Sequence, residues 1–153
     1  MRALEPWVEP PLTTFVAESQ VRVALLMTSA GQVVAQHGFT RSLDVMTAAA
    51  LAAGIVASTR EIAKEMSAGP FGAVVHQGSQ LGVYLAPFDM PHNHWIGLCV
   101  FGPDTSLGMV QLFFGRMVDE LVKIAPRTPP AREVLPETFE DDLNSSLRAL
   151  FGR

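Results

Sequence analysis

The segment from Ser42 to Met66 constrains the fold most, because it is predicted to form one long helix that is apolar on almost every side. A surface helix of a small domain needs one apolar stripe, but this segment has two. The first stripe carries large side chains: Leu51, Ile55, Ile62 and Met66. The second is mostly small and ends in a charge: Ala49, Ala53, Val56, Ala57 and Arg60.

We expect the large stripe to pack on a sheet and the small stripe to face another helix or a partner protein, since small side chains permit close approach. The alternative is that the small stripe is covered within the monomer.

Length and composition favour one domain with extensions. The chain has 153 residues, of which 48% are hydrophobic, a high value that is consistent with an oligomer whose interface is also apolar. The richest apolar run, Ala48 to Ala57, is shorter than the roughly 20 residues of a membrane span, so we expect no membrane insertion. The first residues lack the apolar stretch of a signal peptide, and we expect a cytoplasmic protein. The net charge of −4, without a basic cluster, argues against nucleic acid as a partner.

Hydrophobic periodicity and turn residues divide the chain into four parts. Residues 1–20 are predicted to be an irregular, proline-containing arm followed by a short helix over 12–20, and residues 21–125 a domain. Residues 126–136 form a proline-rich tether, and 137–153 contain an amphipathic helix. Within the domain, strands are predicted at 21–28, 32–37, 71–76, 81–86 and 94–101, and helices at 42–66 and 107–124, the first capped by Ser42 and the second by Ser106.

This order of two hairpins around a helix, then a strand and a second helix, predicts the α+β class. We expect a five-stranded, mainly antiparallel sheet with helices on its faces.

No residue pattern points to catalysis, so the chain is not expected to be an enzyme. Glycine-rich phosphate loops are missing from the sequence, and no nucleotide or other cofactor is expected. His92 and His94 lie near Asp89 and offer possible metal ligands, but a solvated loop without metal is the expected state. Cys99 lies in an apolar run and is expected to be a small buried side chain.

Several segments resemble the roadblock family, whose members have a profilin-like fold with this element order. They are Val23-Ala-Leu-Leu-Met-Thr-Ser-Ala-Gly-Gln-Val-Val-Ala35, the alanine-rich helix, and Leu107-Gly-Met-Val110. A closer similarity is to the MglB-type regulators of bacterial gliding. It rests on Val75-His-Gln-Gly-Ser-Gln-Leu-Gly-Val-Tyr-Leu85, on Pro103-Asp-Thr-Ser-Leu-Gly108 and on Asp141-Asp-Leu143 before the last helix. The prolines of the arm depart from the family, whose first helix is usually longer.

The resemblance implies a homodimer that engages a Ras-like small GTPase of the MglA type. Such regulators stimulate hydrolysis without an arginine finger of their own, by holding the catalytic residues of the GTPase in place. The residues then expected to contact the GTPase are Ala53, Ala57, Arg60, Glu61 and Lys64. Those expected in the dimer interface are Ala49, Val56, Phe71, Ala73 and Val75.

Two other functions remain open at this point. One is a dimeric scaffold that places partner proteins side by side without affecting hydrolysis. The other is a small-ligand sensor, which would need a pocket lined by His76, Tyr84, His94 or Trp95.

The last helix carries an apolar stripe that is too short to be stable alone in water: Phe139, Leu143, Leu147 and Leu150. This stripe either contacts the partner or docks on the protein's own dimer, and the sequence does not decide between the two.

Overall fold

The computed structural model describes residues 2–3, 5–38, 44–67, 69, 72–127 and 139–151. Within these residues the strands form one sheet in the order β1-β3-β2-β6-β5-β4, and every neighbouring pair is antiparallel. The strands are β1 (Arg2–Ala3), β2 (Val23–Thr28), β3 (Val33–His37), β4 (Val74–Gln77), β5 (Gly82–Asp89) and β6 (His94–Phe101). The helices are the 3-10 helix η1 (Pro6–Val8), α1 (Glu9–Ser19), α2 (Val45–Glu65), α3 (Leu107–Ile124) and α4 (Phe139–Phe151). The predicted α+β class and the five antiparallel strands are confirmed, and the two-residue β1 adds a sixth.

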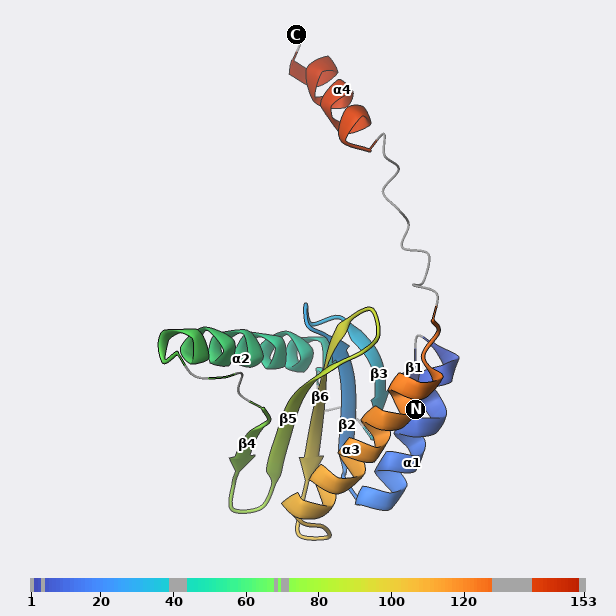
Figure 1. Ribbon diagram of the computed structural model, residues 1–153, viewed down its shortest axis with the longest axis vertical. Coiled ribbons are helices and arrows are strands. Elements are labelled where there is room, and N and C mark those ends of the chain that lie inside the picture. The colour runs from blue at the N-terminus through green and yellow to red at the C-terminus, as the bar shows by residue number, and fades with distance from the viewer. Residues whose placement is uncertain are drawn as a thin grey trace.

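The sheet has helices on both faces (Figure 1). Alternate residues of a strand point to opposite faces, and along β2 the side chains of Leu25 and Met27 join α2 in one core. Ala24 and Leu26, which alternate with them, belong to a second core with α1 and α3. The central strand β6 pairs with both β2 and β5, so the two cores lie on opposite faces of the same central strands.

The beginning of the chain is more regular than the predicted arm. Helix α1 starts at Glu9 and follows η1 directly, so it is longer than the expected 12–20. Pro10 and Pro11 lie in its first turn, where backbone N–H groups have no helical acceptor and proline is tolerated. Ahead of the helix, Trp7 stacks on Trp95 of β6 with ring centroids 5.8 Å apart, which anchors the segment to the sheet.

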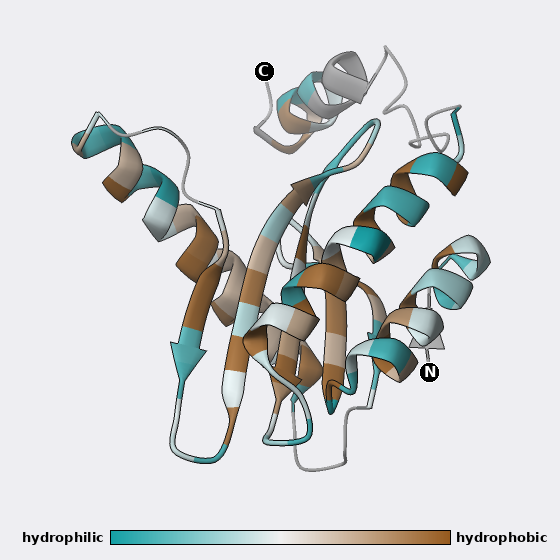
Figure 2. Ribbon diagram, turned by 60° about the horizontal axis from the view of Figure 1, so that its bottom comes forward, coloured by the Kyte–Doolittle hydropathy of each residue, from teal (hydrophilic) through white to brown (hydrophobic). Residues whose placement is uncertain are grey.

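Helix α2 begins two residues later than a Ser42 cap would require. Its cap is Asp44, whose carboxylate accepts hydrogen bonds from the Thr47 backbone N–H at 3.1 Å and from the Thr47 hydroxyl at 2.6 Å. Ser42 itself lies outside the described residues. The helix ends at Glu65, and Ser67 takes the left-handed conformation with φ of 51°. In both views α2 extends beyond the sheet edge, so much of its surface faces solvent (Figures 1 and 2).

By length and mean hydropathy α2 is able to cross a membrane, although its apolar run was expected to be too short. A helix of a globular domain meets the same criteria. Here Ala49, Ala52 and Val56 of α2 are buried against the sheet, and charged residues occupy the last turns, which is typical of a domain helix.

Helix α3 agrees with its prediction. Ser106 caps it by accepting a hydrogen bond from the Met109 backbone N–H at 3.3 Å. Its buried stripe consists of Val110, Phe114, Met117 and Leu121. The tether beyond Arg127 lies outside the described residues, and in α4 the structure describes the side chains of 144–150.

Candidate partner-binding surfaces on α2 and β4

The structure reverses the expected roles of the two α2 stripes. The small residues Ala49 and Val56, 0% and 3% exposed, pack on the sheet, and the large stripe does not. The reason is volume: the facing sheet surface already carries Leu25, Met27, Leu85 and Ile96, and small residues on α2 allow close contact with them. Ala49 and Val56 are therefore core residues of the single chain, and their assignment to a dimer interface is wrong.

The large stripe is an exposed apolar surface of the chain. Leu51 is 64% exposed, Ile55 47%, Ile62 51% and Met66 66%. Figure 2 shows brown, hydrophobic bands along α2 where the helix projects beyond the sheet. Four large apolar side chains exposed along one side of a helix are typical of a protein–protein contact. We call Leu51, Ile55, Ile62 and Met66 the apolar side of α2.

The predicted GTPase contacts lie on the other side of the same helix. At 100° per residue, Ala53, Ala57, Arg60 and Lys64 are on one side, and Leu51, Ile55 and Ile62 are roughly opposite. Ala53 is half-buried beside the sheet, whereas Ala57, Arg60, Glu61 and Lys64 are exposed. Lys64 donates to Glu61 at 3.1 Å, an exposed ion pair that adds little stability and leaves both groups accessible. We call Ala53, Ala57, Arg60, Glu61 and Lys64 the charged side of α2.

Strand β4 forms an open edge of the sheet. Among the described residues it pairs with β5 on one side and has no strand partner on the other. Gly78 N–H donates to the Leu81 carbonyl at 2.8 Å, so residues 78 and 81 are a hydrogen-bonded pair. Because such pairs alternate along an antiparallel ladder, Val75 and Gln77 direct their backbone groups to the open edge. Of the residues predicted for the interface, Ala73 and Val75 are exposed here, and Phe71 lies outside the described residues.

The residues named for a small-ligand pocket do not converge. Tyr84 and Trp95 are buried in the core, 8% and 5% exposed, while His76 and His94 are on the surface. Burial raises the pKa of the Tyr84 phenol, so it stays protonated at neutral pH. These positions do not form a binding pocket.

The remaining candidate chemical groups are inert or already paired. His94 Nδ1 lies 2.6 Å from Asp89 Oδ1, and His92 Nε2 lies 2.8 Å from the Arg127 carbonyl oxygen. No cluster of three metal-ligating side chains occurs among the described residues. Cys99 is buried, and desolvation raises the pKa of its thiol far above the usual range, so it is not a nucleophile at neutral pH. The surfaces of α2 and β4 are thus the strongest functional candidates.

A family model described as the Roadblock/LC7 domain matches residues 12–90. No curated protein matches the sequence significantly. Among solved structures the chain is similar to MglB from Myxococcus xanthus, with 26% identity and a TM-score of 0.71, over 79% of this chain and 96% of that one. It is also similar to the gliding protein MglB from Thermus thermophilus, with 30% identity and a TM-score of 0.65, over 78% of this chain and 88% of that one.

A profilin from Acanthamoeba castellanii shares the fold at 17% identity and a TM-score of 0.53, over 76% of this chain and 97% of that one. At this identity the similarity concerns the fold alone. The match agrees with the profilin-like architecture expected from the order of the elements.

Proposed function

Because this chain belongs to the Roadblock/LC7 family, we propose that it is a cytoplasmic homodimeric regulator, of the GTPase-activating type, of a Ras-like small GTPase. The similarity to MglB structures supports this class of function. The observation that carries the proposal is the division of α2 into two exposed surfaces of different chemistry on opposite sides of one helix.

The apolar side of α2 suits a second copy of the chain. Large exposed residues such as Leu51 and Ile62 favour a contact that is permanently buried, because they are costly to leave in water. The open edge of β4 suits the same role, since two identical edges pair about a two-fold axis. The proposed interface therefore consists of Leu51, Ile55, Ile62, Met66, Ala73 and Val75, so the large stripe replaces Ala49 and Val56.

The charged side of α2 suits a partner that binds and dissociates. Ala53 and Ala57 permit close approach of the partner backbone. The side chains of Arg60, Glu61 and Lys64 supply polar contacts, and water solvates these side chains well when the partner dissociates. In the proposed dimer two such surfaces are related by symmetry.

The contribution of this chain to hydrolysis is differential affinity. The GTPase supplies the arginine and glutamine that act on the γ-phosphate, and the regulator binds the conformation in which they are in place more tightly than the others. A tenfold preference, about 1.4 kcal/mol, raises the population of that conformation relative to the others tenfold.

The test mixes the purified protein with the Ras-like GTPase encoded nearest to its gene, loaded with GDP or with a GTP analogue. Phosphate release from GTP is measured with and without the regulator. We expect binding to the GTP-analogue form and faster release. The variant Ala57→Arg places a guanidinium on the charged side of α2. It should lower the affinity for the GTPase at least tenfold, because the larger side chain blocks close approach of the GTPase backbone.

The matched control is Gln111→Arg. Gln111 is an exposed residue of α3, on the sheet face opposite to α2, so the same charge there should leave binding within about twofold. Circular dichroism of both variants checks that they are folded. Equal binding of both nucleotide states without any change in phosphate release would instead favour a dimeric scaffold.

A further inference from the structure

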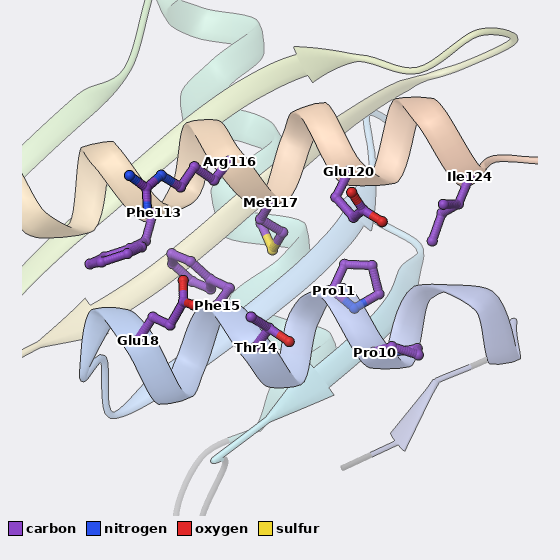
Figure 3. Close-up of a pocket in the computed structure, with 10 residues that line it drawn as sticks. All are labelled: Pro10, Pro11, Thr14, Phe15, Glu18, Phe113, Arg116, Met117, Glu120 and Ile124. Carbon is purple, nitrogen blue, oxygen red and sulfur yellow. The ribbon is translucent and has the colours of Figure 1, made fainter.

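A groove lies between α1 and α3, on the sheet face opposite to α2 (Figures 1 and 3). Its volume is about 330 Å³. The lining side chains come from α1 and α3 alone, and in Figure 3 Phe15 and Met117 lie between the two helices. The proposed dimer and GTPase surfaces on α2 and β4 do not use it.

The groove has an apolar floor and a charged rim. Phe15 and Met117 form the floor, and Arg116 stands at one end, 5.2 Å above the centroid of the Phe113 ring. Among the described residues Arg116 makes no salt bridge. Glu120 is one turn further along α3, toward the end marked by Ile124 (Figure 3).

Helix α4 exposes the described part of its apolar stripe. Leu147 is 42% exposed and Leu150 79% exposed, and the sequence continues the stripe through Leu143 to Phe139. A helix of 13 residues is marginal in water, and most helices of this length are stabilised by packing of the apolar side. In Figure 1 α4 lies apart from the sheet and the other helices.

We propose that α4 docks in the α1–α3 groove of its own chain, parallel to α3. The stripe from Phe139 to Leu150 spans eleven residue steps, about 16 Å of helix. The α3 wall from Phe113 to Ile124 spans the same eleven steps. The stripe and the groove therefore match in length as well as in polarity.

The charged residues of α4 and of the groove favour the parallel direction of docking. The acids of α4 are in its first turn, at Glu140, Asp141 and Asp142, and the parallel direction places this turn beside Arg116. The positive end of the α4 dipole then faces Glu18, across the groove from Arg116 in Figure 3. The antiparallel direction would instead place the acidic turn beside Glu120, at the end of the groove where the lining offers no cation.

The connection is long enough for this arrangement. Parallel docking requires the chain to return from Arg127 to the level of Phe113, about 20 Å along the α3 axis. The eleven residues 128–138 reach up to about 36 Å when extended. Docking within one chain also has the advantage of a high effective concentration.

The test is a cysteine cross-link in the full-length chain. The only native thiol, Cys99, is buried and unreactive, so introduced cysteines are selective. Thr14 is an exposed residue of the groove wall, and Ser146 borders the α4 stripe. The pair Thr14→Cys and Ser146→Cys is expected to form a disulfide rapidly, with the product at the mass of a single chain on a non-reducing gel.

The matched control replaces Ser145 in place of Ser146. Ser145 points away from the stripe, and we expect its cross-link with Thr14→Cys to form about tenfold more slowly. Equal rates for the two pairs, or no cross-link in either, would overturn the proposal. A product at twice the chain mass would also overturn it, because the groove would then hold the helix of another copy.

A charge reversal tests the direction. Arg116→Glu should slow the cross-link severalfold, and Glu140→Lys with Asp142→Lys should restore it in the same chain. If Glu120→Lys alone accelerates the cross-link in the chain that keeps Arg116 and the native acids of α4, the acidic turn lies beside Glu120, and the parallel direction is wrong. None of these readouts involves a GTPase, so they are independent of the proposed function.

Discussion

At the scale of single residues, one glycine determines how closely α3 approaches the sheet. Gly97 lies in the middle of β6, beneath the ring of Phe114, and a Cβ atom built there would overlap that ring. The ring is also held by Tyr84 in an edge-to-face contact with centroids 5.3 Å apart. Any side chain at position 97 must therefore displace a packed aromatic cluster.

We predict that Gly97→Ala lowers the free energy of unfolding by about 1–3 kcal/mol, the usual cost of overpacking a core. The control is Gly115→Ala in α3, where a Cβ atom meets nothing within 4 Å, and which should raise stability by about 0.5–1 kcal/mol. Urea denaturation of the three proteins measures both changes. A neutral Gly97→Ala would show that α3 can shift away from the sheet at no cost.

The cap of α2 should give its stability a pH dependence. The hydroxyl and backbone N–H of Thr47 hold the pKa of the Asp44 carboxyl below its usual value of 3.8. Because the pKa of Asp44 is lower in the folded state, its contribution to stability is fully present above the pKa of the unfolded state. That contribution is lost as the pH falls through the pKa of the folded state. We predict that the difference in thermal midpoint between the native chain and Asp44→Asn, constant above pH 5, shrinks below about pH 4. A constant difference down to pH 2 would contradict this role.

The residue patterns that could be interpreted correctly are those with a local cause. The sequence predicts Ser106 as a cap because a hydroxyl before a periodic apolar run is a local signal, and the structure confirms this prediction. Asp44 has the same kind of signal but was missed, because Ser42 offers an equally good oxygen two residues earlier. Local chemistry alone does not choose between two candidate caps that lie two residues apart.

At the scale of elements, the strands were predictable and the orientation of α2 was not. The predicted bounds of β6 coincide with those observed, because its apolar run ends in turn residues on both sides. The periodicity of α2 revealed two stripes, but the choice of the stripe that meets the sheet depends on the volumes of Leu25, Met27 and Ile96 across the interface. Those residues come from distant parts of the sequence, so the correct pairing required the structure.

The exposed apolar side of α2 leads to a prediction about assembly. Leu51→Glu should leave α2 folded, since Leu51 is 64% exposed, but it should raise the dimer dissociation constant at least tenfold by placing two charges in a symmetric contact. The control Ala50→Glu adds the same charge at the neighbouring exposed position, which faces another side of the helix. Analytical ultracentrifugation gives both constants. If Leu51→Glu dimerises as tightly as the native chain, the apolar side of α2 is not the interface.

At the scale of the whole molecule, the two-fold assembly should depend on the backbone of β4. Two β4 edges that pair about a symmetry axis would extend the sheet across both copies and remove an edge that is otherwise prone to aggregation. The sequence predicts a strand at 71–76, which the structure places at Val74–Gln77. Which of its backbone groups are free depends on the hydrogen-bond phase of the β4–β5 hairpin.

Val75 allows this edge to be tested without breaking the hairpin. Its N–H points to the open edge, so Val75→Pro removes a donor that β5 does not use, and proline is tolerated on such an edge. We predict that Val75→Pro keeps the circular dichroism spectrum of the native chain but is a monomer by static light scattering at micromolar concentration, where the native chain is a dimer. Val75→Thr, which retains the N–H, should remain dimeric. If Val75→Pro also remains a dimer, the two copies are held by α2 alone and the β4 edges do not pair.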